Sequence, residues 1–316
     1  MTDTSMICAG IDVAKSHLDI AIFPCGESLR VGYDADGLKQ LDAFLRQHGV
    51  CRVGFEASGG YEGRLMVHLR MRAWPAVRLQ PAQVRAYARS RLQRAKNDRL
   101  DAMLIARFTE SLERLPALPQ ARFDALAAEL TYLEQIEQQI ALIKTFAETT
   151  PSPLIRRRHD RDITRLETLR RTYLLRLEKA VRRDLELSRR LDLMISIKGI
   201  GLRSAVCLVI RMPELGSASR AEIAALAGVA PYDDDSGKRR GRRHIQGGRE
   251  RLRKSLFMCA FTATRHNPDL AAFYARLRQN GKEHLCAVIA VARKLIILAN
   301  TVIARDAPWT PQYKAE

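Results

Sequence analysis

The sequence lacks the marks of secreted, zinc-dependent and membrane-spanning proteins. It contains six cysteines, at positions 8, 25, 51, 207, 259 and 286. None of them forms a Cys-x-x-Cys pair, which supports neither a disulfide framework nor a zinc site and suits reduced thiols in a cytoplasm. The N-terminus has no basic region followed by an apolar core, and no apolar run approaches the ~20 residues that span a bilayer. We therefore expect a cytoplasmic protein without a membrane span.

Acidic residues are scarce relative to basic ones. The 316 residues include 35 Asp and Glu against 53 Lys and Arg, which gives a formal net charge of +18 and a pI near 10.1. The hydrophobic share of 47% is that of a globular protein and argues against disorder. Because such an excess of charge repels itself, we expect a polyanionic partner, with nucleic acid as the first candidate and an anionic membrane surface as the second.

The N-terminal third has the pattern of alternating strands and helices. Apolar runs bounded by turn signals predict strands at residues 7–13, 17–23, 28–33, 52–55 and 76–79. Helical periodicity predicts helices at residues 38–45, 61–72 and 98–112. Strands, a helix and then strand–helix alternation form the order typical of a ribonuclease H-like sheet. We therefore expect an α/β domain over residues 1–115.

The middle of the chain favours two long helices. Apolar residues recur every three or four positions from Phe123 to Ile143 and again from Ile163 to Leu191, with a break at Pro151-Ser152-Pro153. The pattern predicts either two antiparallel helices packed as a hairpin or a coiled-coil arm that joins a second copy. Both interpretations stay open for this helical region, which we assign to residues 116–192.

A mostly helical C-terminal domain is expected over residues 193–316. The segment Ile197-Lys198-Gly199-Ile200-Gly201, followed by an apolar helix, resembles a helix-hairpin-helix element. Its paired glycines permit a tight turn whose amides can hold a phosphate. A plain helix–helix turn explains the same pattern equally well.

Four acids stand near the ends of predicted elements: Asp12, Glu56, Asp98 and Asp101. Asp98 and Asp101 are three residues apart and share one face of a helix, and strand ends can bring the other two acids to the same point. Four hard oxygen ligands suit one or two Mg²⁺ ions, which can clamp the attacking and leaving oxygens of a phosphodiester. Each acid alone has a simpler explanation as a helix cap, a turn former or a surface charge.

Basic residues surround the last two acids and fill a second segment. Between Lys238 and Lys254, nine Lys or Arg residues accompany one Glu, and glycines space the loop, as in a phosphate-binding segment. Ser236 heads this loop; such a serine is most often a turn or cap residue, and as a nucleophile it needs activation by a metal or a carboxylate. The candidate nucleic-acid contacts are Arg89, Arg91, Arg94, Lys96, Lys198, Gly199, Gly201, Lys238, Arg239, Arg240, Arg242, Arg243, Arg249 and Arg253.

The acidic segments closely resemble the motifs of a known family. Gly10–Lys15, Phe55–Tyr61 and Lys96–Ala102 are similar to the three acidic motifs of the insertion-sequence 110 family of bacterial transposases. These are the DEDD recombinases, to which the Piv-type DNA invertases are also similar. The resemblance continues in family order to about residue 300. Its C-terminal motifs are Ile197–Gly201, Leu226–Pro231 and Asp235–Lys238.

The resemblance implies a role for each motif. Asp12, Glu56, Asp98 and Asp101 would form the DEDD tetrad of a RuvC-like nuclease domain that binds Mg²⁺. Ser236 would attack the DNA phosphate and hold a covalent phosphoserine link during strand exchange. The family works as an oligomer, so a dimer or tetramer is expected, and a structured bridge RNA guides it to donor and target DNA. We therefore expect a bacterial transposase with no membrane among its partners.

Two other classes of protein stay open. A metal-dependent nuclease or junction resolvase would use the same acids with an inert Ser236, and a nucleic-acid-binding protein would keep the fold without catalysis. A sugar-kinase-like fold also opens with Gly-Ile-Asp, but it requires a second glycine-rich phosphate loop and an adenosine motif, which we do not find. The three aspartates before Ser236 are left out of the catalytic set.

Overall fold

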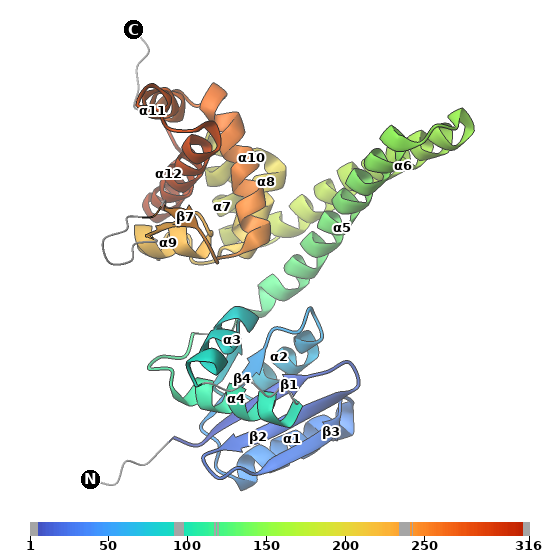
Figure 1. Cartoon of the computed structure of the whole chain (residues 1–316), viewed down its shortest axis with the longest axis vertical. Coiled ribbons are helices and arrows are strands. Elements are labelled where there is room, and N and C mark those ends of the chain that lie inside the picture. The colour runs from blue at the N-terminus through green and yellow to red at the C-terminus, as the bar shows by residue number, and fades with distance from the viewer. Residues whose placement is uncertain are drawn as a thin grey trace. The chain divides into compact units, whose positions relative to one another are not determined.

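The structure is a computed structural model that describes residues 6–91, 98–116, 118, 120–233, 241 and 243–311, with the backbone alone at residues 98–100. The chain forms two compact units, Met1–Ala121 and Arg122–Glu316. The first holds the sheet and the second holds most of the helices (Figure 1). An α/β N-terminal part and a mostly helical remainder are therefore confirmed.

The N-terminal unit contains a five-stranded mixed sheet in the order β3-β2-β1-β4-β5. Strands β1, β2 and β3 pair antiparallel, and β4 and β5 join β1 in parallel. All of the strands predicted in this unit are present, because alternating apolar residues bounded by turns suit a half-buried strand. Their bounds are Cys8–Val13 (β1), His17–Phe23 (β2), Ser28–Gly32 (β3), Arg52–Glu56 (β4) and Ala76–Leu79 (β5).

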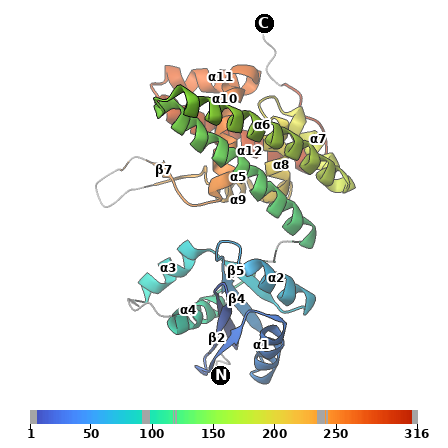
Figure 2. The same ribbon diagram turned by 90° about the vertical axis from the view of Figure 1, so that its right-hand side faces the viewer.

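Helices cover both faces of this sheet (Figure 2). Helices α1 (Ala35–Gln47) and α2 (Glu62–Met71) share one apolar core with the strand residues Ile11, Ile20 and Phe55. Helix α4 (Asp98–Glu110) packs on β1, β2 and β4, and α3 (Pro81–Ser90) packs beside α4. The α3 helix was not predicted, because Val84 is its only fully buried residue and leaves little apolar periodicity to read.

Two glycines allow α4 to lie directly on the strand backbones. A Cβ atom at Gly10 would sit 2.1 Å from the carbonyl oxygen of Ala102, and one at Gly54 would sit 1.8 Å from Oγ1 of Thr109. Any larger side chain at either position would push the helix away from the sheet. The α4 face of β1 and β4 is therefore the face that carries Gly10 and Gly54.

Among its described residues, the second unit is helical apart from one short two-stranded ribbon. Its hydrophobic core contains residues from the N-terminal half of the first long helix, such as Leu130. Residues of the last helix, such as Leu295, belong to the same core. The elements are α5 (Ala121–Thr149), α6 (Pro153–Arg182), α7 (Leu185–Ser196), α8 (Leu202–Arg211), α9 (Arg220–Leu226), β6 (Pro231–Tyr232), β7 (His244–Ile245), α10 (Glu250–His266), α11 (Pro268–Gln279) and α12 (His284–Arg305).

Helices α5 and α6 form an antiparallel hairpin. The hydroxyl of Tyr173 on α6 donates to Glu129 on α5, and Lys144 near the end of α5 pairs with Glu167 of α6 at 2.8 Å. Ile136, Ile140 and Leu166 form a small apolar core farther along the pair. The interpretation as a packed hairpin is thus confirmed, and a role in joining copies stays a prediction.

The second apolar run was expected to be one helix, but it is two. It breaks at Arg183, and the carboxylate of Asp184 then accepts a hydrogen bond from the amide of Leu187 at 3.1 Å and caps the new helix α7. An Asp at this position satisfies an amide that the first turn of a helix leaves without a partner. The sequence pattern hides the break because both helices keep the same apolar spacing.

Helix α12 is strongly apolar. Its 22 residues include a window of mean hydropathy 2.0 that is long and apolar enough to cross a membrane, so the expectation that no such run exists does not hold here. Half of that window is buried inside the protein, and Val291, Leu295 and Ala299 are completely buried. Buried core helices meet the same criterion of length and hydropathy. Helix α12 packs against α7, α9, α10 and α11, as a core helix does.

Candidate active site and nucleic-acid interface

The strand register places two of the predicted acids side by side. Gly10 pairs with Gly54 and Ile11 with Phe55 in the parallel β1–β4 ladder, so Asp12 and Glu56 occupy the next position on each strand. Side chains alternate between the faces of a strand, and both acids therefore share the α4 face with Gly10 and Gly54. Both are partly exposed at the carboxyl ends of their strands.

Helix α4 brings the third acid to this part of the sheet. Asp101 immediately precedes Ala102, whose carbonyl oxygen lies against Gly10, two residues before Asp12. Asp98 is the first residue of α4, and its side chain lies outside the described part of the chain. The fold thus brings Asp12, Glu56 and Asp101 toward one edge of one sheet face, and each of these side chains already has an interaction partner.

The donor chemistry of these acids fits a hard divalent cation. Carboxylate oxygens are the ligands that Mg²⁺ takes from proteins, and the acids lie on rigid elements. Within the side chains that the structure describes, no three His, Cys, Asp or Glu residues come close enough to hold a metal ion. Asp12, Glu56 and Asp101 therefore do not form a metal site by themselves among the described side chains, and the tetrad with Asp98 stays a prediction.

A buried acid that the sequence interpretation missed lies beside Asp12. Asp19 of β2 pairs with Asp12 across the antiparallel ladder, so the two share a sheet face, and Asp19 is only 4% exposed. Its carboxylate accepts hydrogen bonds from Nε and Nη2 of Arg30 at 2.7 and 2.9 Å. The arginine compensates the charge of Asp19 next to Asp12. The sequence signal for Asp19 was an acid at a buried position of an otherwise apolar strand.

A second missed acid fixes the loop that follows Glu56. Glu62 is 7% exposed, and its Oε2 accepts hydrogen bonds from the amides of Ser58 and Gly60 at 3.1 and 2.8 Å. Gly59 and Gly60 adopt φ values of +73° and +116°, which favour glycine. Glu62 therefore ties the loop after Glu56 to the start of helix α2.

The serine loop of the second unit is closed at its base by strand pairing. Tyr232 pairs with His244 and Pro231 with Ile245 in the β6–β7 ribbon, and Arg243 forms an ion pair with Asp233. Ser236 falls outside the described residues and so does the middle of the loop. The predicted contacts that also fall outside them are Arg94, Lys96, Lys238, Arg239, Arg240 and Arg242.

Two arginines that follow the loop form hydrogen bonds and ion pairs within the protein. Arg249 donates from Nη1 to the carbonyl oxygen of Arg211 at 2.6 Å and forms an ion pair with Glu214. Burial raises the pKa of Glu214, but the hydrogen bond and charge of Arg249, a backbone hydrogen bond and the charge of Arg190 together outweigh burial and lower the pKa overall. Arg253 donates to the carbonyl oxygen of Gly247 at 2.7 Å. Both guanidinium groups therefore position the end of the loop, and their contact with nucleic acid stays a prediction.

The remaining predicted contacts lie on exposed surface. Lys198 and Gly201 are exposed in the turn between α7 and α8, where Gly199 has a φ of +107° and packs against Ala263. Arg89 and Arg91 are exposed at the end of α3, and the guanidinium of Arg91 lies 5.5 Å from the ring centre of Tyr87. These cations are open to solvent and available to phosphate groups.

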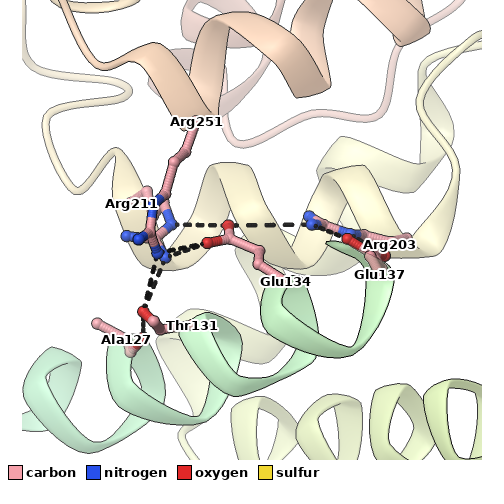
Figure 3. Close-up of polar contacts among 7 residues, drawn as sticks. All are labelled: Ala127, Thr131, Glu134, Glu137, Arg203, Arg211 and Arg251. Atoms are coloured by element: carbon pink, nitrogen blue, oxygen red, sulfur yellow. Dashed lines mark hydrogen bonds and ion pairs between the residues drawn. The ribbon is translucent and has the colours of Figure 1, made fainter. Parts of the chain in front are cut away.

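A charged cluster, which sequence reasoning also missed, fixes the start of α10 (Figure 3). Glu134 of α5 is 7% exposed and pairs with Arg211 of α8 at 2.9 Å and with Arg251 of α10 at 2.7 Å. Beside it, Arg203 makes two hydrogen bonds to Glu137. Burial lowers the pKa of Arg203, but its hydrogen bonds to Glu137, the charge of Glu137 and its interactions with Cys207 together outweigh burial and raise the pKa overall. The cluster ties the hairpin to the helix that follows the serine loop.

Comparison with known proteins places this arrangement in a class of DNA-transposing enzymes. A family model described as "Transposase", of the DEDD type, matches residues 9–150. A second model, "Transposase IS116/IS110/IS902 family", matches residues 191–275. The first match covers the sheet unit and helix α5, and the second runs from the end of α7 into α11 and includes the serine loop. The chain belongs to the IS110 family of transposases.

Several known proteins are similar in sequence to part or most of this chain. The pilin gene-inverting proteins of Moraxella bovis and Moraxella lacunata are each 26% identical over 95% of this chain and 96% of their own length. An uncharacterized 43.6 kDa protein of insertion element IS110 from Streptomyces coelicolor is 31% identical over 33% of this chain and 26% of its own length. The match to the Thermus thermophilus RuvC structure covers 36% of this chain and 84% of the RuvC chain. The sequence identity is 18% and the TM-score is 0.22.

Proposed function

We propose that this transposase cuts and rejoins DNA with a carboxylate-held Mg²⁺ site and with Ser236 as the nucleophile. The observation that carries the proposal is the β1–β4 register, which sets Asp12 and Glu56 at neighbouring positions on the face that α4 covers. Asp101 approaches the same edge from α4, and Asp98 would complete the set. A bound cation would polarise the phosphodiester and stabilise the charge that develops on its oxygens.

The serine step conserves the phosphodiester bond energy. Oγ of Ser236 attacks the phosphorus atom, the bond from phosphorus to one sugar oxygen breaks, and a new serine–phosphate ester forms. The proton leaves the serine hydroxyl for a nearby base or water, and the released sugar oxygen takes up a proton. Attack by a second sugar hydroxyl reverses these steps, so that no nucleotide cofactor is consumed. The β6–β7 ribbon and Arg249 hold the two ends of the loop for this chemistry.

The partners proposed for the reaction are nucleic acids and further copies of this chain. The charge of +18 fits binding to donor and target DNA together with a structured guide RNA. An oligomer would supply the serine loop of one copy to the carboxylates of another, and the bacterial cytoplasm would hold all of these components. These assignments rest on the family resemblance and the charge.

Carboxylate substitutions test the proposed function. Asp12→Asn and Glu56→Gln should each reduce Mg²⁺-dependent DNA strand breakage at least about 100-fold, because each removes one charged ligand oxygen from the site. DNA binding measured in EDTA should not change. Glu27→Gln is the matched control, because Glu27 is an exposed acid in the turn between β2 and β3. Full activity in either carboxylate variant would contradict the proposal.

A further inference from the structure

Helix α6 carries a long basic stripe on its outer surface. Taken at 100° per residue, Arg157, Arg161, Arg165, Arg176 and Lys179 point within about 60° of one direction, and Thr168 and Thr172 lie between them. All of these residues are exposed, and Arg183 continues the row at the end of the helix. We call this row the α6 stripe. It contains no acid, because Asp160, Asp162, Glu167 and Glu178 lie about 90° or more away around the helix.

Apart from Arg176, which reaches Glu129 of α5 at 3.8 Å, the stripe lies on the side of α6 opposite its packed face. Leu166, Leu177 and Val181 are buried on the opposite side, in the cores shared with α5, α7 and α8. Figure 1 shows the outer end of the α5–α6 hairpin reaching beyond helices α7 to α12 of the same unit. From Arg157 to Lys179 the stripe is about 33 Å long, at about 1.5 Å per residue.

The charges of the stripe are poorly compensated within the protein. Among the described residues, Arg157, Lys179 and Arg183 form no ion pair. Arg165 and Arg176 have only long contacts with acids, at 4.0 and 3.8 Å, and their side chains are 75% and 69% exposed. Like charges four residues apart on a helix destabilise it by about 0.2–0.5 kcal/mol per pair. The arrangement therefore has a cost, which an external polyanion would offset.

We propose that the α6 stripe binds the phosphate backbone of double-stranded DNA along about one helical turn. One turn of duplex measures about 34–36 Å, close to the length of the stripe. The stripe offers guanidinium, ammonium and hydroxyl groups but no aromatic ring, so it suits a stacked duplex rather than unpaired bases. The inference shares with the proposed function only that DNA is the partner, and it needs neither the carboxylates nor Ser236.

A matched pair of charge variants tests the proposal on the full chain. The stripe variant carries Arg157→Gln, Arg161→Gln, Lys179→Gln and Arg183→Gln. The control variant loses the same four charges from exposed positions off the stripe: Arg170→Gln, Arg220→Gln, Lys282→Gln and Arg305→Gln. Binding to a 30-base-pair DNA duplex is measured by fluorescence anisotropy in EDTA at several salt concentrations. EDTA separates this test from the metal-dependent strand breakage.

The stripe variant should bind at least about tenfold more weakly than the control at low salt, with the slope of log K against log salt smaller by about 3–4. A third variant with Arg157→Lys, Arg161→Lys and Arg183→Lys keeps the charges and should bind as the unchanged protein does. Equal binding by the stripe and control variants would overturn the proposal. So would a loss confined to duplex RNA, or a loss of oligomers in sedimentation with DNA binding intact.

Discussion

At the scale of single residues, two glycines determine how closely α4 approaches the carboxylates. Gly10 and Gly54 each stand two positions before an acid of the candidate site, on the same strand face. The missing side chains let α4 lie against the strand backbones, and this contact brings Asp101 to the sheet edge. The sequence shows the acids and the glycines. Only the structure shows that the glycines let α4, which carries Asp101, approach the strands that carry Asp12 and Glu56.

Replacement of Gly10 by Ala should destabilise the protein by about 3 kcal/mol, because its Cβ would lie 2.1 Å from the main-chain oxygen of Ala102, which cannot swing aside. The displaced helix should also reduce DNA strand breakage. Gly63→Ala is the control: Gly63 lies in α2, and a Cβ there would meet no neighbouring atom within 4 Å, so alanine should stabilise the helix by about 0.5–1 kcal/mol. Urea unfolding measures both changes, and equal stability of the two variants would contradict this account.

At the scale of helices and strands, local pattern predicted the elements but not their long-range ion pairs. The strands and the long hairpin follow from apolar periodicity, which the sequence displays directly. The break before α7 and the short helix α3 were missed, since one depends on an Asp184 cap and the other buries little. The Asp19–Arg30 pair was missed because it depends on the register of β2 against β3, and the Glu134–Arg211 pair because its members are distant along the chain.

The Glu134 cluster should be a main support of the hairpin. Glu134→Ala leaves the guanidinium groups of Arg211 and Arg251 without their buried carboxylate, and we expect the free energy of unfolding to fall by about 3 kcal/mol. Glu148→Ala, an exposed change on the same helix, should stay within about 0.5 kcal/mol. Thermal unfolding of both variants checks this. A Glu134 variant as stable as the Glu148 variant would show that the cluster contributes nothing.

At the scale of the whole molecule, the chain joins a sheet unit with acids to a helical unit with a basic loop. The composition indicated a polyanionic partner, and the family match identifies the chemistry as DNA transposition. The sequence motifs led to the same family because acids and glycines recur there at fixed positions. Local sequence pattern could not predict whether the carboxylates and Ser236 come close together. Their proximity depends on segments that are distant along the chain or on a second copy of it.

The most direct test of the central claim is to identify the residue that becomes joined to DNA. The full chain is incubated with DNA, Mg²⁺ and candidate flanking RNA, and the adduct is digested and mapped by mass spectrometry. The account predicts a nucleotide on Ser236, loss of the adduct in Ser236→Ala, and its retention in Ser217→Ala, an exposed serine elsewhere in the helical unit. An adduct on another residue, or a Ser236→Ala protein that still cuts DNA and releases free ends, would contradict it.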